Sequence, residues 1–488
     1  MLREHLENPR GMGGLERSPY SGAAGGAACG DLIRISVRVV DGVVVEAGFR
    51  ARGCAAARAA GSATVELVEG ASLLEAAQLT AEAVAAELGG LRPVTRHGAE
   101  LAADAFHRAL GVAARDGAAR LPRSARRTVV AMSGGVDSAA AAQLALDAGE
   151  DVVAVTLELW ADPATDGERS CCSPQAVTGA RALAHRMGIP HFTLDLREEF
   201  RAKVVDGFLD GYAEGRTPNP CVSCNGAVRF DSMLALADRL GAVRLATGHY
   251  ARVAHDGRGP LIRAAVDPAK DQSYVLARLR GDEVARLRFP LGELEKSQVR
   301  ELARAAGLEV ADKPESQDLC FLAGGDTRAF MRRHGGRPLR AAAAGGEIVD
   351  REGSVLGRHG GHHTFTVGQR RGLGLGASEA LYVLRKDARR NRVVVGPRDA
   401  LLTDRVRIER VRLHRPSPEV AAVRLRYHAP PVQCTAAGAF SAGAHESLEL
   451  RLGRPVGAAA PGQTACLMAG DLVVGWGLIA EPSVDDPA

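Results

Sequence analysis

Alternating apolar and polar positions mark the start of the chain as a small α+β unit. Residues 31–50 alternate around Asp41-Gly42, a pair that predicts a β-hairpin with a type I′ turn. Helical spacing of apolar residues follows in three stretches, 55–68, 72–88 and 99–113. Residues 1–113 are therefore predicted to form one domain. The polar, breaker-rich segment 114–127 is expected to be a linker.

Beyond residue 127 the pattern changes to short buried strands that alternate with helices. This alternation predicts a doubly wound α/β domain with a parallel sheet over residues 128–265. Residues 266–336 are expected to be mainly helical and to form a small central domain, whereas the Gly-rich remainder contains short β-type runs. That remainder predicts a small β domain over 337–404 and a C-terminal β-barrel over 405–482. The expected strands of the α/β domain are 128–133, 151–159, 190–196 and 242–250.

The amino-acid composition indicates in which environment the protein folds and works. Apolar residues make up 46% of the chain and charged residues 25%, a balance that supports buried cores. We find no apolar run of membrane-spanning length and no signal peptide in the first residues, so a cytoplasmic protein without a membrane partner is expected. The nine cysteines are then expected to be reduced and to serve metal binding, catalysis or burial.

The charge of the chain is nearly balanced, at +4, and does not by itself indicate a nucleic-acid partner. Arginine-rich clusters nevertheless occur at 120–127, 332–337 and 385–392, where they indicate either solvated faces or anion-binding surfaces. Lysine is rare, with only five residues in the whole chain. Each lysine therefore merits attention as a possible functional group.

The stretch Val129–Leu144 carries the strongest local motif, a buried strand followed by Ser-Gly-Gly-Val-Asp-Ser and a helix. The free N–H groups at a helix start and two adjacent glycines favour a bound phosphate. A Walker A loop is excluded because its Gly-Lys-Ser/Thr ending is missing. The motif resembles the pyrophosphate loop of PP-loop ATPases, which cleave ATP between the α and β phosphates. That resemblance implies that Asp137 helps to hold Mg²⁺.

Six further motifs, in a fixed order, make the resemblance more specific. They are RTPNPCVSCNGAVRF, ATGHYAR, KDQSYVL, SQDLCFL, GGHHTFTVGQRRGLG and GLIAEP. Residues 128 to about 482 thereby resemble the MnmA family of tRNA-specific 2-thiouridylases. The resemblance implies adenylation of the C2 oxygen of uridine 34 in the tRNA anticodon loop, followed by sulfur transfer from a cysteine persulfide.

The resemblance also assigns roles to individual residues. Cys224 is the expected nucleophile and Cys320 the expected persulfide carrier, with a transient disulfide between them. The expected ATP contacts are Ala131, Met132, Ser133, Gly134, Gly135, Val136, Asp137, Ser138, Leu157 and Gly248. The expected tRNA contacts are Asn219, Pro220, Cys221, His249, Lys270, Asp271, Gln272, Arg426, Tyr427 and Gln463.

Cys221 departs from the family pattern, in which many members carry Asp. With Cys224 and Cys320 it provides three thiolates, enough for a [4Fe-4S] cluster with one open iron. The spacing of Cys221 and Cys224 alone is also compatible with zinc or a redox pair. Cys171-Cys172 could add ligands, although a loop pair is the simpler interpretation. Persulfide and cluster routes thus both remain open at this stage.

The N-terminal domain resembles IscU/NifU-type iron–sulfur scaffold proteins through the motifs ENPRGMG, ACGD, RGCAAARAAGSATVELVEG and RHGAELAADA. The resemblance implies a metal site, but Gly98 stands where its third cysteine is expected. Four ligands remain, enough for zinc or a labile cluster; the other interpretation is a domain kept for docking. The matching residues are Cys29, Asp31, Cys54 and His97.

The partners expected are tRNA and a cysteine desulfurase or sulfur relay protein as sulfur donor. Another adenylating PP-loop ligase is an alternative enzyme, but it gives no role to Cys224 and Cys320. A purely non-enzymatic iron–sulfur scaffold is a further alternative, which the intact SGGVDS loop disfavours. Release of AMP that depends on tRNA separates these interpretations.

Overall fold

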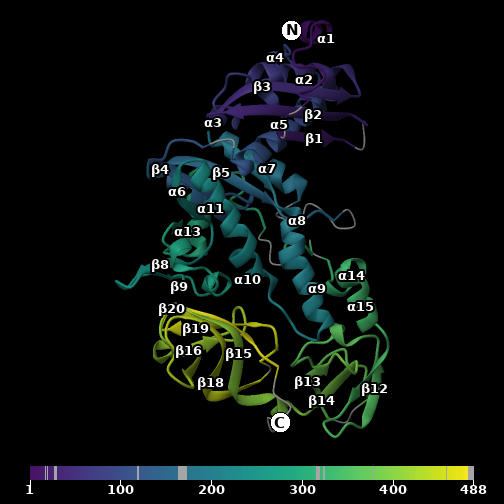
Figure 1. Ribbon diagram of the computed structural model, residues 1–488, viewed down its shortest axis with the longest axis vertical. Coiled ribbons are helices and arrows are strands. Elements are labelled where there is room, and N and C mark those ends of the chain that lie inside the picture. Colours follow the sequence, from purple (N-terminus) through teal and green to yellow (C-terminus); the bar gives the residue numbers. More distant parts are fainter. Residues whose placement is uncertain are drawn as a thin grey trace.

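The architecture of the chain was obtained as a computed structural model, in which the folded parts form an elongated molecule (Figure 1). The N-terminal domain lies at one end, the α/β domain in the middle, and the two β units at the other end. The structure describes residues 1–16, 18, 20–26, 30–117, 120–162, 173–314, 319–322, 325–376, 379–457 and 459–481.

A three-stranded antiparallel sheet in the order β1-β2-β3 forms the base of the N-terminal domain. Asp41 (φ 47°) and Gly42 (φ 76°) both adopt positive φ between paired Val40 and Val43, which confirms the type I′ hairpin. The helix expected over 72–88 is split, because the Thr80 side chain caps a new helix there. The elements are α1 (Leu2–Glu7), β1 (Tyr20–Gly25), β2 (Leu32–Val40), β3 (Val43–Arg52), α2 (Ala55–Val68), α3 (Leu73–Ala76), α4 (Ala81–Glu87) and α5 (His97–Asp116).

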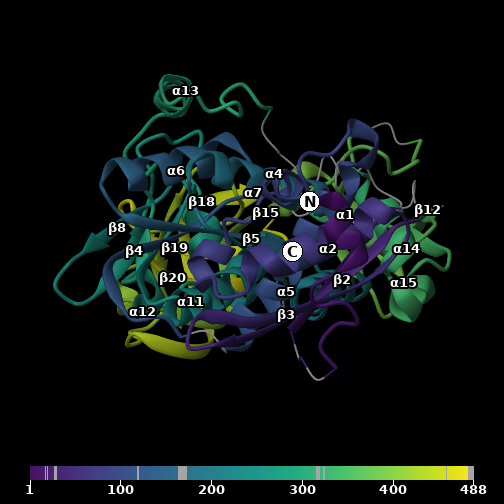
Figure 2. The same cartoon turned by 90° about the horizontal axis from the view of Figure 1, so that it is seen from above.

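The middle domain contains the expected parallel sheet, in the order β10-β7-β4-β5-β6. Apolar side chains alternate between its two faces, so that each face needs a helical cover. Figure 2 shows α6 and α7 on one side of β5, and α5 and α11 on the other. The elements are β4 (Ser124–Ala131), α6 (Val136–Asp147), β5 (Asp151–Glu158), α7 (Pro174–Arg186), β6 (His191–Asp195), α11 (Phe230–Arg239), β7 (Ala242–Thr247) and β10 (Leu287–Arg288).

Helix α5 belongs to the N-terminal domain and also completes the cover of this sheet. Its apolar residues share one core cluster with Val153, Phe192 and Leu194 of β5 and β6. A Cβ atom added to Gly111 would lie 2.0 Å from the carbonyl oxygen of Thr193, so only glycine allows this approach. The two domains are therefore joined by a common core, and α5 and β4 leave only residues 117–123 between them.

Buried polar groups fix the same interface. Arg108 of α5 donates to the fully buried Glu158 carboxylate over 3.1 Å. Asp104 accepts from Arg181 of α7 over 2.8 Å, and its pKa is lowered because the nearby arginine charges outweigh its burial. Buried ion pairs of this kind are costly to break, since one charge would be left without its partner. They specify how the two domains sit together.

Substituting Gly111 by alanine is expected to destabilise the full chain by about 1–3 kcal/mol, because the added methyl group must push α5 away from β6. The measurement is the midpoint of chemical unfolding. Gly207→Ala is the matched control, since this helical glycine has open space around its Cβ position and should be neutral or slightly stabilising. Equal midpoints for Gly111→Ala and the unmodified chain would contradict the close packing of α5.

The segment between β6 and β7 contains two π-helical turns, η3 (Arg201–Val205) and η4 (Asn225–Arg229). Turn η4 connects α10 to α11, so that 220–239 is one continuous helical rod. Short helices and turns make up the central region after β9. The further helices are α8 (Arg197–Phe200), α9 (Asp206–Ala213), α10 (Pro220–Cys224), α12 (Gly281–Val284), α13 (Lys296–Ala305), α14 (Thr327–His334), α15 (Gly336–Ala342) and the 3-10 turns η1 (Pro93–Thr95), η5 (Ser273–Leu276), η6 (His362–Thr364), η7 (Arg398–Leu401) and η8 (Ser417–Glu419).

Two separate sheets form the C-terminal part, as the β-type runs predicted. The first has the order β12-β11-β14-β13; the second runs β15-β18-β17-β16-β19-β20 and closes into a barrel through the pairing of β15 with β20. The hairpin β8–β9 extends the barrel sheet beyond β20. The strands are β8 (Arg252–His255), β9 (Pro260–Arg263), β11 (Gly346–Val349), β12 (Val355–His359), β13 (Tyr382–Asp387), β14 (Arg392–Gly396), β15 (Leu402–Leu413), β16 (Ala422–Arg424), β17 (Val432–Ala436), β18 (Gly443–Gly457), β19 (Thr464–Ala469) and β20 (Leu472–Ile479). Among the helices that the structure describes, none has the length and apolar character needed to cross a membrane.

Candidate active site

The SGGVDS loop connects the carboxyl end of β4 to the start of α6, as its sequence predicts. The Ser138 hydroxyl donates to the Gly135 carbonyl over 3.0 Å and accepts from the Ser133 N–H over 3.1 Å. Gly134 adopts a φ of 72°, which favours glycine. Helix α6 begins at Val136, and its N-cap residue Gly135 has no side chain to cap it, so the N–H groups of the first turn can serve an anion.

Other predicted ATP contacts surround this loop. Gly248, just after β7, lies against it: a Cβ atom there would be 2.7 Å from the carbonyl carbon of Asp137. Met132 is buried, and its carbonyl oxygen accepts a 2.7 Å hydrogen bond from the buried Thr156 hydroxyl. Leu157, the penultimate residue of β5, instead lies in the core cluster that contains α5 and α11, and its contact with ATP stays a prediction. The remaining members of the predicted set, Ala131 and Val136, border the loop on the strand and helix sides.

Two lysines that the sequence analysis did not assign reach the same loop. Lys296, the first residue of α13, places Nζ 2.7 Å from Asp137 Oδ1, which also accepts from the Tyr250 hydroxyl over 2.8 Å. Lys313 Nζ donates to the Gly134 carbonyl over 3.1 Å. The rarity of lysine was the available sequence signal, but nothing local to either residue points to the loop.

The NPCVSCN stretch forms a helix start. The Asn219 side-chain oxygen accepts from the N–H groups of Cys221 (3.1 Å) and Val222 (3.3 Å), and thereby caps α10 at Pro220. Cys224, the last residue of α10, is buried, whereas Cys221 is half-buried. The π-helical turn η4 begins directly after Cys224, and such turns are frequent at functional sites.

Cys320 lies at the edge of an aromatic cluster. It is half-buried, and the ring of the next residue, Phe321, is 5.3 Å from Phe208 and 5.0 Å from Phe330. Phe208 belongs to α9, which follows the turn η3 that packs against α10. Cys224 is a buried member of the large apolar core that extends from the N-terminal domain to the barrel, and Cys221 and Cys320 pack against the same core, which by itself does not place the three thiols together.

The barrel and the central region supply the other predicted tRNA contacts. Tyr427 lies 5.8 Å from the ring of Tyr274, and its pKa is raised to about 12 by burial, by Cys221 and by Asp271. Arg426 beside it is exposed. Gln463 follows Pro461, whose carbonyl accepts from the Thr217 N–H over 2.8 Å, so this barrel loop contacts the segment leading into α10.

Several predicted tRNA contacts are occupied by bonds within the protein. The Asp271 carboxylate is buried, pairs with Arg424 and accepts from the Ser273 hydroxyl. The Gln272 side chain accepts from the Tyr250 N–H, while Lys270 beside it is half-buried. These bonds hold the triplet in a fixed conformation, and its contact with RNA stays a prediction.

His249 is half-buried among protein side chains. Its Nδ1 lies 2.8 Å from the Thr247 hydroxyl, and its ring packs near Phe230 and Phe289. Burial and then the charge of Arg229 lower the pKa of His249 to about 3. The ring is neutral at physiological pH, so any contact with tRNA would be a hydrogen bond or a stack rather than an ionic bond.

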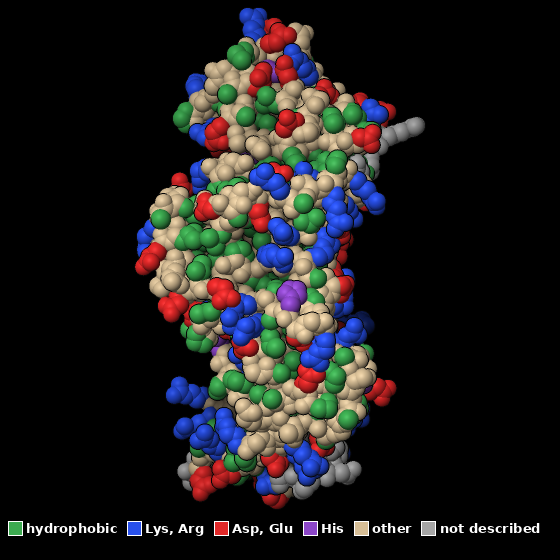
Figure 3. Space-filling view, turned by 90° about the vertical axis from the view of Figure 1, so that its left-hand side faces the viewer, with side chains coloured by type: hydrophobic (Ala, Val, Ile, Leu, Met, Phe, Trp, Pro, Cys, Tyr) green, Lys and Arg blue, Asp and Glu red, His purple; other side chains and the backbone are tan. Residues whose placement is uncertain are grey.

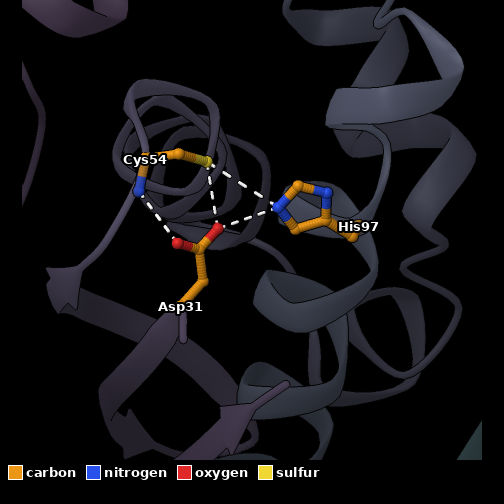
Figure 4. A group of neighbouring side chains, drawn as sticks. All are labelled: Asp31, Cys54 and His97. Atoms are coloured by element: carbon orange, nitrogen blue, oxygen red, sulfur yellow. Dashed lines mark hydrogen bonds and ion pairs between the residues drawn. The ribbon is translucent and has the colours of Figure 1, made fainter. Parts of the chain in front are cut away.

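In the N-terminal domain, three predicted metal ligands point toward one another (Figure 4). Asp31 Oδ2 lies 3.0 Å from Cys54 Sγ and 2.8 Å from His97 Nε2, and the last two atoms are 3.7 Å apart. The hydrogen bond from Cys54 lowers the pKa of Asp31, whereas burial and that same carboxylate raise the pKa of Cys54. This sulfur, oxygen and nitrogen set fits zinc or an iron–sulfur species.

Two details bear on the predicted metal ligands, one on the N-terminal site and one on the three cysteines Cys221, Cys224 and Cys320. A Cβ atom at Gly98 would lie 3.0 Å from the backbone of Ala56 and Ala57, so a side chain at this position requires a small shift of α5 against α2. Within the described ranges, Cys221, Cys224 and Cys320 do not form a close three-ligand group of the kind seen at Asp31, Cys54 and His97. Cys29, Cys171 and Cys172 lie outside the described residues.

Comparison with known families agrees with this division of the chain. Four family models match: the NifU-like N terminal domain over residues 1–115, the tRNA methyl transferase HUP domain over 126–324, the tRNA methyl transferase PRC-barrel domain over 339–397 and the aminomethyltransferase beta-barrel domain over 403–479. Fold and matches together define a HUP-type α/β protein with an added NifU-like N-terminal domain.

Individual relatives show to which family within this class the chain belongs. The bifunctional protein NifU/MnmA of Rubrobacter xylanophilus is 46% identical over 98% of this chain and 97% of its own length. The tRNA-specific 2-thiouridylases MnmA of Magnetococcus marinus (42% identical, 72% of this chain, 99% of that protein) and Methylobacterium radiotolerans (44%, 71% and 90%) match the part without the N-terminal domain. The chain therefore belongs to the MnmA family, in the form that carries a NifU-like domain.

Proposed function

We propose that this protein catalyses the ATP-dependent 2-thiolation of the wobble uridine of tRNA, giving 2-thiouridine, AMP and pyrophosphate. The observation that carries the proposal is the pairing of an anion-binding loop with a helix that holds two cysteines, in a chain that resembles 2-thiouridylases along their whole length. Another adenylating ligase would leave Cys224 and Cys320 without a role. Neither this alternative nor a non-enzymatic scaffold is favoured.

The first step activates the base. The C2 oxygen of the uridine attacks the α-phosphorus of ATP, the bond from that phosphorus to its bridging oxygen breaks, and pyrophosphate leaves with the electron pair. The N–H groups at the start of α6 and the hydroxyls of Ser133 and Ser138 would bind the phosphates. Mg²⁺ would supply further positive charge there. Asp137 is the carboxylate placed to hold it, although one of its oxygens already accepts two hydrogen bonds.

The second step replaces oxygen by sulfur. The terminal sulfur of a Cys320 persulfide attacks C2, and AMP leaves with the oxygen. The Cys224 thiolate then attacks Cys320 Sγ, which forms a Cys224–Cys320 disulfide and leaves the sulfur on C2 as a thiocarbonyl. A thiol reductant must return two electrons to the disulfide before the next turnover. This route needs only two thiols, so Cys221 is left to line the base pocket.

The partners follow from these steps. The tRNA anticodon loop would lie at α10, where the stretch Asn219, Pro220 and Cys221 is expected to face the target base, although Pro220 is buried and the Asn219 side chain caps the helix. Figure 3 shows groups of basic side chains on one face below the N-terminal domain, interspersed with acidic ones. A cysteine desulfurase or sulfur relay protein would supply the persulfide. The Asp31, Cys54 and His97 group would hold a metal ion or labile cluster as cargo.

A reconstituted assay tests the proposed function directly. The full chain, unmodified tRNA, ATP and a persulfide donor are incubated, and the wobble nucleoside is analysed by mass spectrometry. Formation of 2-thiouridine with AMP release that requires tRNA would support the proposal. AMP release that instead requires an amino acid or ammonia would overturn it in favour of another ligase.

Replacing Cys221 by aspartate is expected to keep most thiolation activity, because the persulfide route uses only Cys224 and Cys320. A cluster held by all three thiols would instead be lost, together with activity. The measurement is thiolated uridine and bound iron after anaerobic reconstitution, in a Cys54→Ser background that removes one N-terminal ligand. Cys434→Ala controls for loss of a thiol elsewhere. The cluster route would be established if the Cys54→Ser protein bound about four irons per chain and if Cys221→Asp then lost both the iron and the thiolation activity.

A further inference from the structure

Two of the five lysines converge on the SGGVDS loop from different elements. Lysine is scarce in a chain whose basic residues are nearly all arginine, yet Lys296 and Lys313 both end at this loop. Lys296 opens α13, which packs on α6, whereas Lys313 lies in the turn after that helix. Their ammonium groups contact the loop at Asp137 and at Gly134.

Two neighbouring side chains hold the Lys296 ammonium group beside the loop. Its side chain is only 12% exposed; its Nζ is 2.7 Å from the Asp137 carboxylate and 5.7 Å from the centre of the Tyr250 ring. A buried ammonium group is costly unless it is paired, and the contacts with Asp137 and Tyr250 hold this one in place beside the loop. Lys313 is more exposed and donates to a backbone carbonyl, which leaves its remaining N–H groups for another acceptor.

From this geometry we infer that Lys296 and Lys313 bind the β and γ phosphates of ATP and stabilise the departing pyrophosphate. The inference rests on the proposed function, in which the bond between the α-phosphorus and its bridging oxygen breaks. Negative charge then grows on the bridging oxygen as pyrophosphate leaves with the electron pair. Two ammonium groups beside the loop would neutralise that charge, and compact ammonium ions suit phosphate oxygens. Asp137 alone would repel the same group.

Lys296→Gln and Lys313→Gln, each in the full chain, test the inference with inorganic pyrophosphate as the probe. Charged hydrogen bonds of this kind change affinity by about tenfold or more. Each variant should therefore raise the Kd for pyrophosphate and the KM for ATP by about tenfold. The affinity for AMP, which lacks the β and γ phosphates, should stay unchanged.

A matched control lies on the same helix as Lys296. Arg304 of α13 forms an exposed ion pair with Asp312, so Arg304→Gln removes one positive charge without touching the loop. It should leave the Kd for pyrophosphate unchanged. Lys296→Arg, which keeps the charge, should retain most of the affinity that Lys296→Gln loses.

The outcomes separate the inference from the proposed function. Unchanged pyrophosphate and ATP constants in both glutamine variants would overturn the role of the lysines while leaving tRNA-dependent AMP release intact. If the unmodified chain releases no AMP with tRNA, the proposed function fails instead. Should Lys296→Gln not fold, Lys313→Gln decides the matter, since its loss leaves no buried charge without a partner.

Discussion

Cys320→Ser is expected to abolish formation of 2-thiouridine while the tRNA is still adenylated. A hydroxyl cannot carry a sulfane sulfur, so the second step stops. The first step does not use this residue, and AMP release, with water as the eventual acceptor of the adenylate, should continue. Phe321 remains anchored in its aromatic cluster, so the substitution should not disturb the fold.

The experiment for Cys320 combines two readouts on the same sample. Mass spectrometry of the wobble nucleoside reports sulfur transfer, and chromatography of labelled nucleotides reports AMP release. Cys434→Ala is the matched control, because burial raises the pKa of this barrel thiol to about 12 and keeps it protonated. Thiouridine made by Cys320→Ser would show that Cys320 does not carry the sulfur. Loss of AMP release would show that Cys320 acts earlier than proposed.

Asp137→Asn is expected to lower tRNA-dependent AMP release by at least about a hundredfold. The amide keeps the shape of the side chain but removes the charge that orients Lys296 and that Mg²⁺ would need. Thiolation should fall in parallel, since no adenylate reaches the cysteines. The free energy of unfolding is expected to fall as well, because the nearly buried Lys296 ammonium loses its charged partner, so the rates are compared under conditions in which the variant is folded.

Asp147→Asn is the control for this change. Asp147 ends the same helix, is exposed and accepts a 2.8 Å hydrogen bond from Gln143, so it shares the charge and the element but not the loop. Its AMP release should equal that of the unmodified chain. If Asp137→Asn released AMP at the same rate as Asp147→Asn, the assignment of the SGGVDS loop to the ATP site would be wrong.

Local patterns predicted the elements of this fold well. Asp41-Gly42 specifies its turn through the conformations that these two residues tolerate, and the order of strand, glycine pair and helix specifies the loop. The convergence of Asp31, Cys54 and His97 came from a resemblance and not from spacing, since these residues lie far apart in the chain. The structure places them within bonding distance of one another.

Contacts between distant segments could not be predicted. No local pattern around Gly111 shows that α5 meets β6. A glycine within a helix can have several different causes, and the sequence does not tell them apart. Lys296 and Lys313 stood out only as rare residues, and their convergence requires the packing of α13 on α6. Asn219 was expected at the target base, yet its side-chain oxygen caps α10, a role that depends on where the helix begins.

Helix α5 belongs to the cores of both domains, so the N-terminal domain is fixed against the α/β domain and is not attached to it by a flexible linker. His97 opens this helix and Gly111 touches β6 fourteen residues later, about 20 Å along the axis. Swinging Cys54 toward Cys320 would have to break the Arg108–Glu158 and Asp104–Arg181 pairs. The distance between the two thiols is therefore set by the architecture. The fusion also fixes the ratio of the NifU-like domain to the HUP domain at one to one.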